Sequence, residues 1–257
     1  MADSATELSP RNPRVQRLRR LGTDRSARRS EGVALVEGRV LVAEAASAGL
    51  ELVEEYVGPG GLPVGSSALT LSSEALRRVA TTEEPQPNIA VVRIPEQRDP
   101  STASSVIVAD RVADPGNLGT IIRSAEAAGL DAVVVTPGTT DPWSPKAIRA
   151  SAGAVFHVPI IDADLPALSA AGLRILGTSS HRGEAHSGAD LSGRIAVVLG
   201  NEAHGIAESA PVDAWIRIAH RGRSESLNVA MAGTLIAFRM AECSQERVGT
   251  PAGNGET

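Results

Sequence analysis

The chain has 257 residues, of which 42% are hydrophobic, 21% charged and only 2% aromatic. This length fits one large domain or two small ones, and the apolar fraction excludes a wholly disordered chain. No apolar run reaches the roughly 20 residues of a membrane-spanning helix, and no hydrophobic signal core begins the chain, so we expect a cytoplasmic protein with no membrane partner. Cys243 is the single cysteine, so we expect no disulfide and no metal.

The formal net charge of -5, which by itself disfavours a nucleic-acid partner, is unevenly distributed along the chain. Residues 1–30 contain eight arginines and three acidic residues, so they carry +5 and leave -10 for the other 227 residues. Arginine binds phosphate through a planar, bidentate fork. This segment therefore predicts either a nucleic-acid contact or a solvated basic helix.

Helices and strands alternate in the first part of the chain. The first helix is expected from Asn12, a good capping residue, with Val15, Leu18 and Leu21 at helical spacing. Further helices are expected at 39–49 and 72–83, and strands at 33–38, 50–58 and 88–95. These elements predict a small α/β domain over residues 1–95, and the polar stretch 96–104 predicts a linker.

Residues 105–245 show a more regular alternation and predict a second domain, followed by a flexible tail over 246–257. Its strands are short runs of β-branched residues, which are typical of strands buried on both faces. The expected strands are 105–110, 131–136, 154–161, 173–180, 194–200 and 214–219. Helices are expected near 117–129, 144–152, 164–171 and 226–243. The fold class is therefore α/β, with a mostly parallel sheet covered by helices on both faces.

Common cofactor motifs are missing from this second region. The strand at 105–110 is not followed by the glycine fingerprint of dinucleotide-binding folds, and the single lysine, Lys146, lies outside any phosphate-binding loop. His181 and His186 are five residues apart, off the spacing of helical metal ligands. A nicotinamide-dependent oxidoreductase is therefore disfavoured.

The first segment that breaks local rules is DPGNLGTIIRSAEAAG, at 114–129. Its Pro-Gly pair forces a turn, and Asn117 can cap the helix that follows. Arg123 emerges beside the apolar stripe of this helix, so it is either a functional cation or a surface arginine whose stem covers the core.

Two later segments also place polar residues where a buried strand ends. In VVLGNEAHGI, Gly200 permits close backbone approach, and Glu202 is either a functional carboxylate or a helix N-terminal charge. In SESLNVAMAG, Ser226 and Asn228 stand at a helix start, where they can bind a ligand or cap the helix. Because ligands bind at the carboxyl ends of parallel strands, we expect all three segments to form one cleft.

In this order, NLGTIIRSA, VVLGNEAHGI and SESLNVAMAG resemble the three motifs of the SpoU/TrmH branch of the SPOUT RNA methyltransferases, over about residues 105–243. The basic segment followed by EGVALVEGRVLVAEA resembles the N-terminal substrate-binding domain of the ribosomal-RNA members, which is similar to ribosomal protein L30e. The resemblance implies a SPOUT domain with a C-terminal trefoil knot and a homodimer with its active sites at the subunit interface. It also implies methyl transfer from S-adenosylmethionine to a ribose 2′-hydroxyl of RNA.

The resemblance further implies roles for single residues. Four would hold S-adenosylmethionine, largely through backbone groups: Thr178, Gly200, Ile218 and Leu227. Five would form the catalytic set: Asn117, Arg123, Glu202, Ser226 and Asn228. Four arginines would contact RNA: Arg14, Arg17, Arg20 and, more weakly, Arg149.

The general base proposed for the family corresponds to Arg123, although arginine stays protonated in almost any protein setting. An electrostatic clamp on a phosphate or a developing alkoxide is physically easier, and both roles remain open. Few aromatic residues are available to stack bases, so recognition should rest on phosphate, 2′-hydroxyl and RNA shape. Ribosomal RNA is thus favoured over transfer RNA, and a non-catalytic RNA-binding protein that retains the fold is the remaining alternative.

Overall fold

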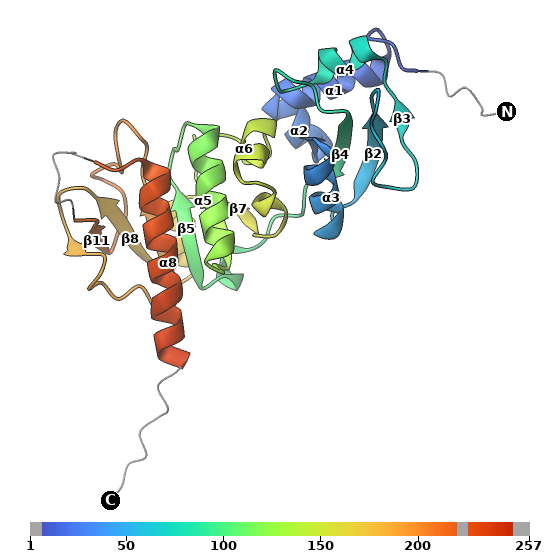
Figure 1. Cartoon of the computed structure of the whole chain (residues 1–257). Coiled ribbons are helices and arrows are strands. Elements are labelled where there is room, and N and C mark those ends of the chain that lie inside the picture. The colour runs from blue at the N-terminus through green and yellow to red at the C-terminus, as the bar shows by residue number, and fades with distance from the viewer. Residues whose placement is uncertain (1–6, 220–225, 249–257) are drawn as a thin grey trace, which may run out of the picture. The chain divides into compact units, whose positions relative to one another are not determined.

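The computed structural model describes residues 7–219 and 226–248, so Ser224, Glu225 and residues 249–257 lie outside the described residues (Figure 1). Contacts divide the chain into two compact units. The first unit comprises residues 1–96 and 141–157, and the second comprises residues 97–140 and 158–257. We expected one domain from 105 to 245, but the contacts group the segment 141–157 with the first unit.

The first unit is built on a mixed four-stranded sheet. Its strands, in spatial order, are β1 (Val33–Glu37), β4 (Asn88–Arg93), β2 (Leu52–Val57) and β3 (Leu69–Thr70). Strand β4 runs antiparallel to both of its neighbours, and β3 is parallel to β2. The three strands predicted for this part of the chain are confirmed, whereas β3 spans only two residues and gives no sequence pattern.

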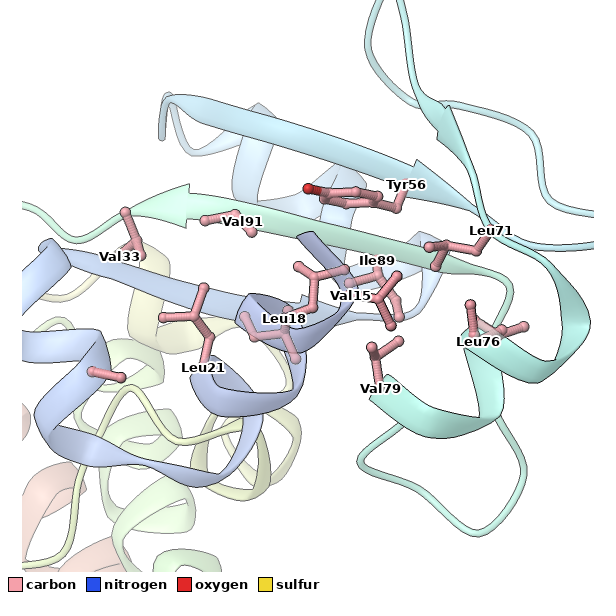
Figure 2. Packing of buried hydrophobic residues seen from close by; sticks show 13 residues of the cluster. Val15, Leu18, Leu21, Val33, Tyr56, Leu71, Leu76, Val79, Ile89 and Val91 are labelled. Carbon is pink, nitrogen blue, oxygen red and sulfur yellow. The ribbon is translucent and has the colours of Figure 1, made fainter. Parts of the chain in front are cut away.

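Helices of the first unit cover this sheet and bury its apolar side chains (Figure 2). They are α1 (Pro13–Thr23), α2 (Arg25–Glu31), α3 (Arg39–Ser47), α4 (Ser73–Val79) and α6 (Pro145–Ala150). Helix α1 begins as predicted, because the Asn12 side chain accepts a hydrogen bond from the Arg14 N–H and Pro13 occupies the first turn. Val15, Leu18 and Leu21 are fully buried in the core that α1 shares with the sheet.

The second unit contains a seven-stranded parallel sheet; the sequence predicts a mostly parallel sheet of six strands and misses the two-residue strand β9 (Glu184–Ala185). In spatial order its strands are β7 (Ile160–Asp162), β6 (Ala132–Val135), β5 (Ser105–Ala109), β10 (Ile195–Leu199), β8 (Arg174–Ser179), β11 (Ala214–Arg217) and β9 (Glu184–Ala185). Strand β10 is central and buried along its whole length, between β5 and β8. The continuous apolar runs of β5, β6 and β10 therefore did mark strands covered on both faces.

The strand predicted at 154–161 is largely wrong. Residues Ala154–Phe156 form the 3-10 helix η2 instead, and only β7, beginning at Ile160, pairs with the sheet. Gly153 precedes the turn with a φ of 87°, and its carbonyl accepts the Phe156 N–H. This left-handed residue reverses the chain, so the apolar side chains that follow are buried without an extended backbone.

Helices flank the parallel sheet on both faces. Helices α5 (Pro115–Ala127) and α8 (Val229–Val248) lie side by side in contact with β5 (Figure 1). Gly233 allows this close packing, because a Cβ there would lie 2.7 Å from Leu199 Cδ1. Helix α7 (Leu165–Ala170) buries Leu168 with the side chains of the opposite face. No helix in the described part of the chain is both long and apolar enough to cross a membrane.

Candidate functional site

The carboxyl ends of β8 and β10 border a cavity of about 500 Å³ in the second unit. All four residues expected to hold the cofactor line it: Thr178, Gly200, Ile218 and Leu227. Three members of the expected catalytic set line it as well: Glu202, Ser226 and Asn228. Segments far apart in the sequence thus meet at the edge where ligands of parallel sheets bind.

Gly200 lies where β10 enters the loop that borders this cavity. A Cβ at this position would lie 2.5 Å from both Gly205 C and Ile206 N. No side chain fits at such a distance from backbone atoms. The close approach that Gly200 permits is therefore made by its own loop, which folds back on the strand end and presents its backbone to the cavity.

Three polar side chains form a hydrogen-bonded chain at the cavity. Asn117 Nδ2 donates to Glu202 Oε1 over 2.9 Å, and Asn228 Nδ2 donates to Asn117 Oδ1 over 3.0 Å. Glu202 also accepts the backbone N–H groups of Ala113, at 3.0 Å, and Asp114, at 3.2 Å. These bonds fix the orientation of both side-chain amides and bring all three sequence motifs together.

Glu202 is held as a carboxylate by these donors. Partial burial raises the pKa of Glu202, but hydrogen bonds from Asn117, Ala113 and Asp114 outweigh it and place the pKa below the ordinary value for glutamate. An ionised carboxylate only accepts hydrogen bonds. In this structure Glu202 therefore fixes the 113–114 turn rather than serving as a helix N-terminal charge.

The two helix starts at the site have caps that differ in part from the expectation. Asp114, not Asn117, caps α5, because its Oδ1 accepts the N–H groups of Gly116, at 2.7 Å, and Asn117, at 3.0 Å. Asn228 does cap α8, accepting the N–H of Ala230 over 2.9 Å. The side chain of Asn117 is thereby left for the chain that joins Glu202 to Asn228.

Arg123 is the member of the expected catalytic set that a single chain does not bring to the cavity. It follows Asn117 by six residues on α5, which turns it roughly 240° around the helix axis. Its side chain is exposed, and among the residues that the structure describes none forms a hydrogen bond or ion pair with its guanidinium group. Arg123 therefore faces away from the carboxylate and amides that the cavity assembles.

The arginines of α1 are largely engaged within the first unit. Arg17 Nε lies 2.7 Å from Glu31 and its Nη1 lies 2.9 Å from Glu54, while Arg20 lies 2.8 Å from Glu31. Arg14 is 3.9 Å from Glu54. The basic segment is thus a packed helix whose charge is partly neutralised.

Arg149 also lies in the first unit, on α6. Its guanidinium donates to the Thr81 hydroxyl, at 2.6 Å, and carbonyl, at 3.2 Å. Thr81 in turn donates its N–H, at 2.7 Å, and its hydroxyl, at 2.5 Å, to the buried Glu37 carboxylate. This network holds α6 to the loop that follows α4.

Sequence reasoning missed three residues that build the site: Asp114, Asn201 and Arg111. Asp114 had a usable signal, because an aspartate directly before proline is a common helix start. Asn201 and Arg111 act through contacts made across the sheet edge, which no local pattern reveals. No three His, Cys, Asp or Glu side chains in the described ranges are grouped to hold a metal ion.

Comparison with protein families matches both units. Residues 104–238 match the model of the SpoU rRNA Methylase family, and residues 12–90 match the MRM3-like substrate binding domain. The first match covers the parallel sheet and the three site loops. The second covers α1 to α4 and most of the small sheet.

Similar proteins cover nearly the whole chain. The "23S rRNA (guanosine(2553)-2'-O)-methyltransferase RlmP" of Bacillus subtilis (strain 168) is 36% identical over 243 residues, which are 90% of this chain and 97% of that protein. The structure of an AdoMet-bound rRNA methyltransferase from Sinorhizobium meliloti has a TM-score of 0.78 at 28% identity and covers 92% of this chain and 97% of that one. The SpoU methyltransferase AviRb from Streptomyces viridochromogenes, in complex with AdoMet, has a TM-score of 0.78 at 25% identity and covers 93% of this chain and 100% of that one. The chain belongs to the SpoU rRNA methylase family.

Proposed function

We propose that the chain transfers a methyl group from S-adenosylmethionine to a ribose 2′-hydroxyl of ribosomal RNA. The observation that carries this proposal is the cavity at the carboxyl edge of the sheet, where Glu202, Asn117 and Asn228 form one hydrogen-bonded chain. The names of the relatives in Bacillus subtilis and Sinorhizobium meliloti support the reaction and the substrate class. A ribosomal-RNA substrate would place the protein in the cytoplasm with the ribosomes.

The cavity fits S-adenosylmethionine in size and chemistry. Its volume of about 500 Å³ lies within the range of small-molecule sites. Leu199, Ile218 and Leu227 offer apolar surface to a nucleoside, and Ser179 and Ser180 offer hydroxyls to its polar groups. When bound, S-adenosylmethionine supplies a methyl group activated on a sulfonium.

The side chains at the cavity would orient the RNA. Ionised Glu202 accepts one N–H of Asn117, and Asn117 accepts one N–H of Asn228. Each amide group has a second N–H in a direction fixed by the first. We propose that these donors hold ribose or phosphate oxygens so that the 2′-hydroxyl lines up with the methyl group, with Ser226 shaping the same pocket.

Arg123 would act on the 2′-oxygen as an electrostatic clamp. As the oxygen–methyl bond would form, the methyl–sulfur bond of the sulfonium would break to leave a neutral thioether, and the hydroxyl proton would pass to solvent. A guanidinium that stays protonated would stabilise the negative charge developing on oxygen. This role needs Arg123 beside the reacting atoms, a position that a single chain does not give it.

A homodimer would supply Arg123 from the second copy. Helix α8 exposes apolar side chains at helical spacing: Met231 at 61%, Leu235 at 46% and Phe238 at 48%. Such a stripe is unusual on a monomer and is typical of an interface. Because α5 packs beside α8, we propose that a partner covering this stripe also reaches α5 and its Arg123.

The backbone path supports a trefoil knot as part of this proposal. Strand β10 is inserted between β5 and β8, and the chain then returns to β11 on the far side of β8. We propose that α8, which follows, passes through the loop that these crossings form. Such a knot is a rare exception to the rule that chain connections are unknotted.

The first unit would bind the RNA, as its match to the substrate binding domain supports. Arg14, Arg17 and Arg20 remain candidates for phosphate contacts, although Glu31 and Glu54 compete for their guanidinium groups. Arg149 would contribute by holding the loop at Thr81 rather than by meeting phosphate directly.

Tritiated methyl transfer to purified RNA tests the proposed reaction. We expect label in ribosomal RNA with the wild-type chain, near-complete loss with Arg123→Ala, and normal transfer with Arg98→Ala. Arg98 is the matched control, being an exposed arginine of the same unit with no hydrogen bond or ion pair to the rest of the described chain. Label in transfer RNA alone would overturn the substrate class, and full activity of Arg123→Ala would overturn the role of this residue.

A further inference from the structure

Arg111 occupies an unusual position where β5 ends. It adopts a left-handed backbone with a φ of 56°, which side chains other than glycine seldom adopt. Its N–H donates to the hydroxyls of Thr136, at 3.1 Å, and Thr139, at 2.9 Å. Its guanidinium lies 2.9 Å from the carboxylate of Asp110, which is largely buried. The backbone here is therefore held by contacts on both sides of the residue.

The carbonyl that this backbone presents is used by the cavity loop. Asn201 Nδ2 donates to Arg111 O over 2.8 Å. Asn201 Oδ1 accepts the N–H groups of Ala203, at 3.0 Å, and His204, at 3.1 Å. The guanidinium of Arg111 also reaches the Gly205 carbonyl, at 3.4 Å. One side chain, Asn201, thus closes its own turn and fastens that turn to the end of β5.

We infer that Asn201 and Arg111 are positioning residues that hold the loop at residues 200–205 in the shape that binds S-adenosylmethionine. All six loop residues line the cavity, whereas Arg111 lies outside it and acts through Asn201. This inference rests on the proposed function, because it takes the cavity as the cofactor site. The bond between Asn201 and Arg111 should therefore affect the affinity for the cofactor and not the methyl-transfer step.

Glu202 provides a comparison within the same loop. Its carboxylate binds the N–H groups of Ala113 and Asp114, only two and three residues beyond Arg111. The loop therefore has two fastenings to one segment, and only the Glu202 fastening continues into Asn117 and Asn228. Loss of the Asn201 fastening should disturb the shape of the cavity wall while the amides that face RNA stay in place.

Four substitutions separate the parts of this fastening. Asn201→Asp keeps an acceptor for Ala203 and His204 but sets a carboxylate oxygen against the Arg111 carbonyl, and Asn201→Ala removes both functions. Arg111→Gly keeps the carbonyl and favours the left-handed backbone, whereas Arg111→Val disfavours that backbone because valine is β-branched. The glycine and valine variants both lack the guanidinium, so they differ chiefly in where the carbonyl points.

We would measure the Kd for S-adenosylmethionine by isothermal titration without RNA. The KM for S-adenosylmethionine and kcat would be measured in the presence of RNA. We expect Asn201→Asp, Asn201→Ala and Arg111→Val to raise Kd and KM about tenfold, the worth of roughly one hydrogen bond, while kcat at saturating cofactor changes by less than about threefold. Arg111→Gly should stay within about threefold of wild type, because it keeps the bond to Asn201.

Two results would overturn the inference: wild-type affinity in Asn201→Asp, or equal affinities in Arg111→Gly and Arg111→Val. A fall in kcat with unchanged KM would instead place Asn201 in the transfer step and would also overturn it. Hydrogen exchange at Ala203 and His204 gives a readout that needs no cofactor. Exchange at these two N–H groups should be faster in folded Asn201→Ala than in the wild-type chain. If the wild-type chain did not bind S-adenosylmethionine, the proposed function would be wrong, but the exchange experiment would still test whether Asn201 holds the loop.

Discussion

Single carboxylates organise loops in both units by accepting several hydrogen bonds at once. In the first unit, buried Glu37 accepts bonds from Thr81, Thr82 and Gln86, and in the second, Glu202 holds the 113–114 turn. Burial raises the pKa of Glu37, but hydrogen bonds from Thr81 and its neighbours outweigh it and lower the pKa below the ordinary value. Both carboxylates are therefore most effective when ionised.

Substitution of Glu37 by glutamine should lower the free energy of unfolding by about 2 kcal/mol at neutral pH, because the buried carboxylate loses its charged hydrogen bonds. Because the pKa of Glu37 is lower in the folded chain than in the unfolded one, its stabilisation is complete above the unfolded pKa and is lost as pH falls through the folded pKa. The difference between wild type and variant should thus shrink in acid. Urea denaturation at neutral and acidic pH checks this, with exposed Glu83→Gln as a neutral control; a difference independent of pH would contradict it.

Substitution of Glu202 by glutamine should lower kcat about tenfold with little change in Tm. The Glu202 carboxylate accepts hydrogen bonds from two backbone N–H groups and from the Asn117 amide. In glutamine one of the two oxygens becomes an NH2 group, which cannot accept, so at least one of these bonds must break. Steady-state kinetics beside a melting curve check this, and Glu208→Gln, an exposed carboxylate of the same region, is the control. A variant with wild-type kcat would remove Glu202 from the account.

At the scale of elements, strong periodic patterns predicted the fold and failed where one residue redirects the chain. The apolar runs of β5, β6, β8 and β10 predicted buried parallel strands, and the spacing of Val15, Leu18 and Leu21 predicted α1. The cap of α5 and the turn at Gly153 depended on which of several suitable local structures the chain adopts, and the residue types alone do not decide this. Asp114 takes the capping role expected of Asn117, and Gly153 turns the chain where a strand was expected.

Several residues of the candidate site could be predicted from the sequence, but its connections could not. The motifs named Gly200, Glu202 and Asn228, and the structure brings them to one cavity. The hydrogen bond from Asn201 to Arg111 joins residues 90 positions apart, and neither residue type predicts it. Such pairs become visible only when the strand ends are placed side by side.

The charge of α1 leads to a prediction about RNA affinity. Arg19 on α1 and Arg77 and Arg78 on α4 are exposed, and their guanidinium groups have no partner in the part of the chain that the structure describes, in contrast to Arg17 and Arg20. Helices α1 and α4 pack together, and we propose that these three cations contribute to one RNA-binding surface of the first unit. Plotted against the logarithm of the salt concentration, log K for RNA binding falls with a slope of about 0.9 for each phosphate contact. Replacing all three arginines by alanine should therefore reduce the size of this slope by about 2 to 3.

The variant for comparison replaces Arg14, Arg17 and Arg20 by alanine, because their charges are shared with Glu31 and Glu54. We expect it to change the slope by less than half as much. Filter binding over a range of salt concentrations gives both slopes. A larger effect of this second variant would place the RNA on the Arg17 side of α1.

At the scale of the whole molecule, we propose that each active site is formed by two chains. Glu202 and Asn228 line the cavity and Asn117 is hydrogen-bonded to both, whereas Arg123 lies six residues beyond Asn117 on α5, the helix that packs beside α8. Covering that stripe buries apolar side chains and can bring a partner's arginine to the cavity. Leu235→Glu with Phe238→Glu should therefore give a folded monomer without methyl-transfer activity, measured by sedimentation and by the tritium assay. An active monomer would contradict the shared site.

Complementation between two inactive variants tests the same arrangement. A heterodimer of Arg123→Ala with Asn228→Ala, made by co-expression with two tags, should have one intact site and about half of wild-type activity, since its intact cavity meets the intact arginine of the other chain. Each homodimer should be inactive. An inactive heterodimer would show that Arg123 serves the cavity of its own chain.

The central claim is that this cavity directs a methyl group to a ribose 2′-hydroxyl of ribosomal RNA. Mass spectrometry of nucleosides from RNA treated with the chain and S-adenosylmethionine tests it most directly, because methylated ribose and methylated base give different fragments. We predict one 2′-O-methylated nucleoside in ribosomal RNA, absent after treatment with Arg123→Ala and present after treatment with Arg98→Ala. A methyl group on a base, or no methylated nucleoside from a chain that binds both RNA and S-adenosylmethionine, would contradict the account.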